Sequence, residues 1–345
     1  MSTTLMFTGD INLMNVTAPE APFVRVKSVL QQADVLFGNL ECCFYTPSGE
    51  RSITDEGFYA APAMVEGLRD AGYAAVGTAN NVNYGKEAIL SSLAALDRAG
   101  IKHTGSGANR AAARAPAIVE QNGVRVGYLQ RTSVYWPTNH EAGEHTPGVA
   151  ALKGHTAYHL PLHKLRPEIP PANRPGVPPE VITWTDPAYL AQLREDIAEL
   201  KRKVDIVVAS HHWGLLEDVL QYMTETAHAA IDAGADMVIG HGPHYSLPVE
   251  MYRGKPIFYG LGSFSFHTGH YGRKHGDWVG MLARVKLDGD TVKEAAFRLV
   301  RHNDDNETYF CDPAKESVAL EGITKRTTRL GTTLVVGKEE VSIAL

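Results

Sequence analysis

Short apolar runs and longer segments with helical spacing alternate along the chain up to residue 130. The apolar runs, each bounded by polar residues or glycine, predict the strands 4–8, 34–38, 74–78, 117–120 and 124–130. Helical spacing, such as that of Ile89, Leu93 and Leu96, predicts the helices 23–32, 61–71 and 86–99. Because strands and helices take turns, we expect a layered α/β fold.

The same alternation returns in the second half of the chain. It predicts the helices 187–203 and 220–233 and the strands 206–209, 237–239, 249–252 and 256–259. A last pair of strands, 279–287 and 291–300, is joined by the turn Asp288-Gly289-Asp290. We expect a single domain over residues 1–310 and a C-terminal extension, 311–345, that packs on it.

Residues 131–187 interrupt this pattern. The segment contains most of the prolines and includes stretches such as PLHKLRPEIPPANRPGVPPE. Proline removes amide donors and breaks helices, so we interpret the segment as a long insertion in the domain. It is either a surface excursion or a lid over the active site, since loops of this length are usually functional or disordered.

Polar residues of the metal-ligand type follow five of the predicted strands. They are Asp10 with Asn12, Asn39 with Glu41, Asn80 with Asn81, His211 with His212, and His241 with His244. Each pair alone is typical of a turn, a helix cap or a packed histidine. The carboxyl ends of strands in an α/β sheet form one ligand crevice, however, so together the pairs predict a functional site at one rim.

The most specific of these signals is the segment Gly240-His241-Gly242-Pro243-His244. Two histidines three residues apart, on a loop that directly follows an apolar strand, fit metal ligation better than packing. Mixed oxygen and nitrogen ligands suit Mn, Fe, Co, Ni or Zn. A carboxylate between two such ions can bridge them, and the ions can then support a hydrolytic displacement. We therefore expect one or two divalent metal ions.

Composition and charge narrow the class of protein. A chain of 345 residues with 44% hydrophobic residues needs no disulfides, and the three cysteines, two of them adjacent, indicate reduced thiols. The net charge of −6 and the lack of a basic run argue against nucleic acid as a partner. We find neither a signal-peptide pattern nor a membrane segment, and we expect a cytoplasmic protein of open oligomeric state.

Six sequence blocks carry a resemblance to a known family. They are FTGDINL, DVLFGNLE, GTANNVNYG, ASHHWG, IDAGADMVIGHGPH and KPIFYGLGSF. In this order they resemble the CapA (poly-γ-glutamate capsule synthesis) family, whose members are similar to calcineurin-like metallophosphoesterases. The resemblance covers residues 4–285 and implies a four-layer α/β/β/α sandwich. It is more specific for the fold and the site than for the substrate.

The resemblance also implies a set of metal ligands. These are Asp10, Asn12 in the place of a ligand histidine, Glu41 as the bridging carboxylate, Asn80 or Asn81, His212, His241 and His244. The chain departs from the family at Val82, which replaces the histidine expected to protonate a leaving group. It departs again at Asn83, where the family has aspartate, and at Ser263, where the family has asparagine. The N-terminal membrane anchor that is usual in the family is also absent from the sequence.

Histidines that follow the last block offer a replacement for the one missing at Val82. His267 and His270 are candidates for a general acid or base, although a polar surface loop is the ordinary interpretation of such a segment. We expect them to act in catalysis with Asp10 and His212.

Three functions stay open at this point. The first is a metal-dependent hydrolase of an ester or amide bond in a small, anionic or peptide-like substrate. The second is a peptide epimerase in which Asp10 and a site histidine form an acid/base pair, an interpretation that the change at Val82 favours. The third is a non-catalytic accessory protein of polyglutamate or capsule synthesis, with a metal site kept for structure.

Overall fold

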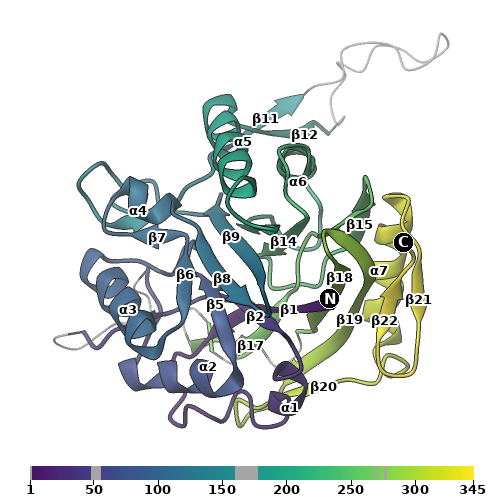
Figure 1. Ribbon diagram of the computed structural model, residues 1–345, viewed down its shortest axis with the longest axis horizontal. Helices are drawn as coiled ribbons and strands as arrows, with labels where there is room; N and C mark the ends of the chain where they lie inside the picture. Colours follow the sequence, from purple (N-terminus) through teal and green to yellow (C-terminus); the bar gives the residue numbers. More distant parts are fainter. Residues whose placement is uncertain (1, 48–55, 160–177, 267, 270–271, 276–277) are drawn as a thin grey trace.

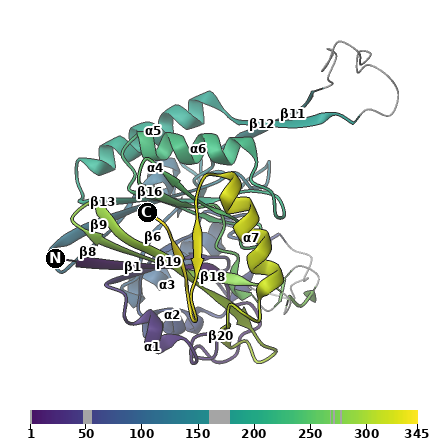
Figure 2. The same ribbon diagram turned by 90° about the vertical axis from the view of Figure 1, so that its right-hand side faces the viewer.

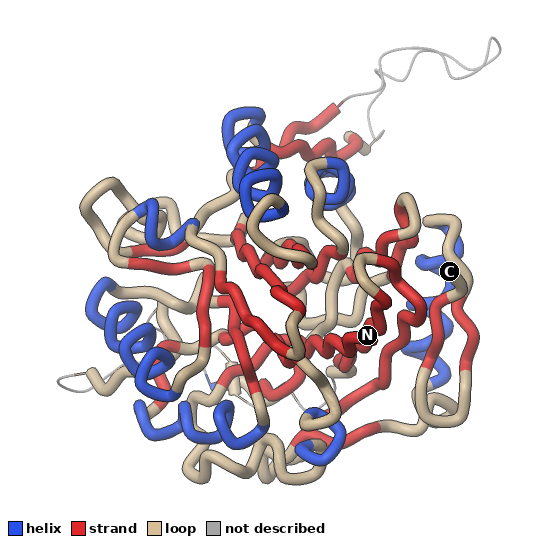
Figure 3. The backbone as a smooth tube through the Cα atoms, in the orientation of Figure 1, coloured by secondary structure: helices blue, strands red, loops and turns tan. Residues whose placement is uncertain are grey.

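The computed structural model of the chain describes residues 2–345 except 48–55, 160–177, 267, 270–271 and 276–277. Two β-sheets form its centre, and Figure 3 shows the helices grouped around the strands. The fold is therefore of the α/β class, as the alternating pattern predicts.

The larger sheet, of ten strands within the described residues, is mixed in direction. Its order is β21-β22-β19-β18-β1-β2-β5-β6, with β17 paired to β1 and β20 paired to β19. The central strand β1 is parallel to β2 and antiparallel to β18. The strands are β1 (Ser2–Asn12), β2 (Val35–Leu40), β5 (Tyr73–Gly77), β6 (Lys102–Thr104), β17 (Ser263–Phe266), β18 (Gly280–Asp288), β19 (Thr291–His302), β20 (Thr308–Phe310), β21 (Leu334–Val336) and β22 (Val341–Ile343).

The smaller sheet has six strands among the described residues, in the order β15-β16-β14-β13-β9-β8. Its inner strands β9, β13, β14 and β16 are parallel, so their carboxyl ends lie at one edge. The strands are β8 (Ala117–Gln121), β9 (Val124–Thr132), β13 (Ile206–His212), β14 (Met237–His241), β15 (Val249–Tyr252) and β16 (Lys255–Phe258).

An apolar core joins the two sheets face to face. Residues of β1 and β2, such as Phe7 and Phe37, lie in one cluster with Tyr128 of β9 and Val208 of β13. The ring of Phe37 stacks on that of Tyr128 with centroids 4.7 Å apart. Burial of such aromatic side chains is a main source of the stability that holds one sheet against the other.

Helices cover the outer face of each sheet (Figures 1 and 2). The larger sheet packs on α1 (Lys27–Leu30), the 3-10 turn Pro62–Met64, α2 (Val65–Ala71) and α3 (Lys86–Ala99). The smaller sheet packs on α5 (Pro187–Lys201) and α6 (Gln221–Asp232). Asp186 starts α5, because its carboxylate accepts hydrogen bonds from the first backbone amides and Pro187 follows it.

The C-terminal residues extend the larger sheet. Strand β22 pairs with β19, and α7 (Ser317–Arg329) buries Leu320 and Ile323 against the core between the sheets. Within the described part of the chain, none of the helices is both long enough and apolar enough to span a lipid bilayer.

The structure differs from the predicted elements in two main places. The helix expected at 23–32 is helical only at α1; the β-branched residues Val24, Val26 and Val29 disfavour a helix there. The insertion, for which no regular period was found, contains short β10 (Gly148–Val149) and the antiparallel hairpin of β11 (Gly154–His159) and β12 (Glu180–Thr185). The base of this hairpin packs on α6, while its far end projects from the body (Figure 1).

Further short elements connect the main ones. They are β3 (Cys43–Phe44), β4 (Tyr59–Ala60), β7 (Ser106–Gly107) and α4 (Arg110–Arg114).

Candidate metal centre

The two sheets together position the candidate metal ligands. Asp10 lies near the end of β1, and Glu41 directly follows β2 in the larger sheet. His212 and His241 are the last residues of β13 and β14 in the smaller sheet, and His244 lies in the turn beyond β14. Side-chain exposure is 1% or less for the first four and 24% for His244. The strands therefore continue into the site, and their polar ends are buried against one another.

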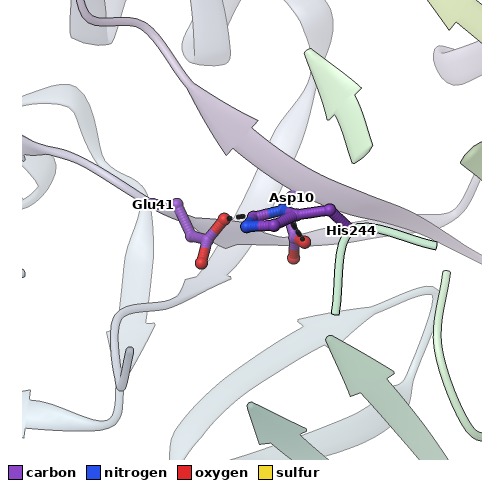
Figure 4. Close-up of side chains that lie close together, drawn as sticks. All are labelled: Asp10, Glu41 and His244. Carbon is purple, nitrogen blue, oxygen red and sulfur yellow. Dashed lines mark ion pairs between the residues drawn. The ribbon is translucent and has the colours of Figure 1, made fainter. Parts of the chain in front are cut away.

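The side chains of this cluster are in direct contact. His244 Nδ1 lies 3.1 Å from Asp10 Oδ2 and 3.7 Å from Glu41 Oε2, so that its ring reaches both carboxylates (Figure 4). His241 Nδ1 lies 3.6 Å from Asp10 Oδ1, and His212 Nε2 lies 2.8 Å from Glu41 Oε1. Asp10, Glu41 and His244 alone offer three ligand atoms within 4.8 Å of one another.

Several buried polar atoms of the cluster have no hydrogen-bond partner in the described structure. These atoms are Asp10 Oδ2, Glu41 Oε2 and both ring nitrogens of His241. A buried polar atom without a partner is costly, and most such atoms in folded proteins are satisfied. Carboxylate oxygens and imidazole nitrogens that converge in this way fit a divalent cation, which accepts lone pairs from all of them.

The hydrogen bonds around His212 fix which ring nitrogen faces Glu41. The hydroxyl of Thr132 donates to the carbonyl of Val134 at 2.8 Å, so it is left to accept from His212 Nδ1 at 3.1 Å. His212 Nε2 then points a lone pair at Glu41 Oε1. Two acceptors at 2.8 Å need a proton or a cation between them.

Burial and mutual charge set the protonation of the two carboxyl groups. Burial raises the pKa of Glu41 well above its ordinary value, and the negative charge of Asp10 raises it further. Burial opposes ionisation of Asp10 too, but contacts with His241 and His244 lower its pKa below the ordinary value. Burial lowers the pKa of His212 to about 4. Without a metal, the proton between Glu41 and His212 therefore resides on Glu41.

A chain of amides holds Asp10 in place. Asn39 Nδ2 donates to Asp10 Oδ1 at 2.9 Å, and Gln130 Nε2 donates to Asn39 Oδ1 at 3.0 Å. Gly77 leaves room for Gln130, because a Cβ there would lie 2.3 Å from its side-chain amide. Sequence reasoning found Asn39 as a strand end but missed Gln130 and Thr132. Their signal was a polar residue at the buried end of an apolar strand.

Gly242 has a local role that its position in the turn requires. Its φ is +109°, and a Cβ would lie 2.8 Å from the carbonyl oxygen of Trp213 and 3.0 Å from His212 Nε2. Glycine at this position therefore keeps the ligand edge of His212 clear. His244 itself has a φ of +65°, and this left-handed backbone conformation directs its ring back toward the carboxylates.

The predicted asparagine ligands lie at the site, but the side chains of two of them, Asn12 and Asn80, are hydrogen-bonded to backbone groups. Asn12 donates to the carbonyl of Thr268 and accepts from the amide of Met14. Asn80 donates to the carbonyl of Leu40, and its Oδ1 accepts from the amides of Val82 and Asn83. The carbonyl of Asn81 accepts from the indole of Trp136.

The remaining histidines are distributed differently. His267 and His270 lie outside the described residues. His140 is buried, and both its ring nitrogens bond to the backbone, so it fastens the insertion to Asn83; burial lowers its pKa to about 4. His211 lies on the opposite face of β13 and stacks on Trp213.

Comparison with known proteins adds a family. Residues 4–268 match the family model described as bacterial capsule synthesis protein PGA_cap. An uncharacterized protein of Sinorhizobium fredii is 28% identical over 309 residues, which cover 76% of this chain and 66% of the relative. The PGA biosynthesis protein CapA of Bacillus subtilis is 28% identical over 276 residues, which cover 76% and 63%. A probable polyglutamine synthesis accessory protein of Mycobacterium tuberculosis is 35% identical over 194 residues, which cover 53% and 43%. This chain thus spans less than two thirds of the length of each of these relatives.

Proposed function

The chain belongs to the bacterial capsule synthesis protein PGA_cap family, and on that basis we propose that it is a metal-dependent hydrolase of an anionic, peptide-like substrate. One observation carries the proposal. The buried oxygens of Asp10 lie beside nitrogens of His241 and His244, and those of Glu41 lie beside nitrogens of His212 and His244. Several of these buried atoms lack a hydrogen-bond partner in the described structure. The names of the relatives, which mention PGA and polyglutamine, support a substrate rich in carboxylate or amide groups.

Asp10, Glu41, His212, His241 and His244 would hold the metal. Glu41 approaches His212 with Oε1 and His244 with Oε2, an arrangement that suits a carboxylate shared between two ions. A divalent ion held by these residues would supply Lewis acidity and would lower the pKa of bound water into the neutral range. The chain itself orients the ligands and keeps bulk water away from the carboxylates.

The larger architecture supports the same proposal. Two facing sheets with helices on their outer faces are consistent with the α/β/β/α sandwich of the metallophosphoesterase type, which we propose for this chain. We also propose that the first 310 residues form one domain with the insertion at 131–187.

The change at Val82 favours a second candidate. Val82 is buried, with 2% of its surface exposed, so no proton donor is offered from this position. An epimerase would not need a leaving-group acid, and Asp10 with His212 would then move the proton at carbon. The accessory role in the name of the Mycobacterium relative is the non-catalytic alternative.

The test combines metal content with turnover. Protein freed of metal is reloaded with Mn, Fe, Co, Ni or Zn in turn and given a nitrophenyl ester and a glutamate oligomer. His241→Ala and His244→Ala should each lose at least one equivalent of metal and at least about 10–100-fold in affinity. His228→Ala is the control, because His228 binds Glu250 on a different part of the smaller sheet.

Three results would decide against the proposal. Unchanged metal content in both site variants would rule out His241 and His244 as metal ligands. Solvent deuterium bound to carbon in the product, without cleavage, would identify the epimerase. A protein that binds metal but turns over neither substrate with any ion would favour the accessory role.

A further inference from the structure

A groove of about 490 Å³ lies beneath α7, the helix that faces the viewer in Figure 2. One wall is formed by α7 through residues such as Val318 and Ile323. The other includes Tyr245 and Trp278, from the segments on either side of β15, β16 and β17. The groove is therefore built by the C-terminal helix and by the loop that follows the metal-site histidines.

The charged residues of the groove are unequal in sign. Arg301, Lys315 and Arg326 line it, against the carboxylates of Glu217 and Glu316. Arg301 binds Glu316 through Nε and Nη2, at 2.6 and 2.8 Å, so these two charges offset each other. Lys315 is exposed and forms no ion pair among the described residues. Arg326 is paired with Glu217 in the same way, at 2.7 Å, so the excess is the single positive charge of Lys315. In a chain of net charge −6, this unpaired cation favours an anionic occupant.

Arg326 ties the groove to the loop of the metal site. Its Nη1 donates to Glu217 at 2.7 Å, and its Nη2 lies 3.4 Å from the carbonyl oxygen of Ser246, two residues beyond His244. Its buried Nε has no acceptor in the described structure. The guanidinium carries five N–H donors, so donors are left for a carboxylate in the groove.

Trp278 connects the groove with the candidate metal centre. Its ring stacks on that of His244, with centroids 4.6 Å apart and planes 7° apart. The ring of His275 covers its other face at 3.7 Å. One aromatic ring therefore separates the groove from a metal ligand, and that ring is held between two imidazoles.

We propose that the groove beneath α7 binds the anionic peptide chain of the substrate. Lys315 and Arg326 bind its carboxylates, and Trp278 directs the chain toward His244. The inference rests on the proposed function and narrows its substrate class to a glutamate-rich peptide. Both cations lie beyond residue 268, where the family match ends, whereas Tyr245 and Ser246 of the other wall lie within it.

Binding of a fluorescently labelled glutamate oligomer, measured by anisotropy, tests the proposal on the full chain. Lys315→Gln and Arg326→Gln should each weaken binding by roughly 3- to 10-fold, the range of a charge-assisted contact at a partly exposed site. Lys325→Gln is the matched control, because Lys325 is exposed on α7 next to Arg326 and does not line the groove. An oligomer of glutamine, which lacks the charge, should bind weakly to all of them.

Lys315→Gln also guards against a folding artefact, since the exposed Lys315 leaves no buried partner behind. Native affinity in both groove variants would overturn the proposal, as would an equal loss in Lys325→Gln, which would indicate non-specific attraction. Failure of the native protein to bind the glutamate oligomer would overturn it too.

The binding assay needs no turnover, so the two proposals can fail separately. If the groove variants lose binding while no ion supports cleavage, the proposed peptide-binding groove is supported and the proposed hydrolase activity is refuted. If metal-loaded protein cleaves esters but binds no glutamate oligomer, the proposed hydrolase activity is supported and the proposed peptide-binding groove is refuted.

Discussion

Replacement of Glu41 by glutamine should have opposite effects on the metal-free and the metal-loaded protein. The change keeps the shape of the side chain but removes a carboxyl group that is 1% exposed and lies beside a second buried carboxylate. The metal-free variant should be at least as stable as the native protein at neutral pH, because native Glu41 must take up a proton on folding and glutamine need not. The metal-loaded variant should lose most of the stability that the metal confers.

The size of that loss can be worked out. Free metal at 100 times its dissociation constant stabilises the folded state by about 2.7 kcal/mol. Loss of a ligand that weakens binding by about 10–100-fold leaves roughly 1.4 to 0.4 kcal/mol at the same metal concentration. Unfolding 345 residues at about 2.1 cal/mol/K each gives an entropy of about 0.7 kcal/mol/K. The metal should therefore raise the Tm of the native protein by about 4 °C and that of the variant by about 2 °C or less.

Differential scanning fluorimetry with and without metal measures both effects. Glu250→Gln is the control, because Glu250 is also buried but accepts hydrogen bonds from Tyr259 and His228. It should lower the Tm with or without metal and leave the metal response unchanged. A metal response in Glu41→Gln equal to the native one would refute the ligand role of Glu41. A metal-free Glu41→Gln protein less stable than native would refute the argument that Glu41 takes up a proton on folding.

Three further predictions follow from the same structure. Because the pKa of Glu41 is raised, the folded, metal-free protein keeps a proton that the unfolded chain releases. The free energy of unfolding should therefore fall as pH rises above 4.5 and through the pKa of Glu41 in the folded protein. Urea titrations should show this fall with pH in the native protein and not in Glu41→Gln. Burial raises the pKa of Cys42 and Cys311 to about 12, so iodoacetamide should modify both slowly at neutral pH and rapidly after unfolding, as mass spectrometry can measure. With Val82 in place of a leaving-group acid, nitrophenyl esters should be cleaved about 10²–10⁴-fold faster than unactivated esters; equal rates would mean that another group protonates the leaving oxygen.

Much of the fold could be predicted from local patterns. The helix α3 has the predicted bounds, since its apolar residues Leu93 and Leu96 recur at helical spacing and Gly100 ends it in a left-handed conformation. The position of the site at the carboxyl ends of β13 and β14 also followed from the sequence, because parallel strands bring their ends to one edge.

What the local pattern missed depends on contacts between distant residues. The strand β1 continues to Asn12 because β17, some 250 residues later in the chain, pairs with it. The hairpin of β11 and β12 needed a partner strand on the far side of a proline-rich segment. The hydrogen bonds by which Asn80 caps its own turn could not be predicted from the sequence either, since an asparagine at a strand end suits both a metal site and a turn.

The position of β1 in the larger sheet has a consequence for synthesis on the ribosome. This strand emerges before the rest of its sheet, yet one of its neighbours, β18, is made only at Gly280–Asp288, and Ser2 pairs with Asp288. Until then one long edge of β1 stays open, and open edges invite pairing with other chains. Asp10 likewise lacks its partners until His241 and His244 have been synthesised. The nascent chain therefore completes both its sheet and its metal centre late, and chains that terminate before β18 should depend on chaperones to stay unaggregated.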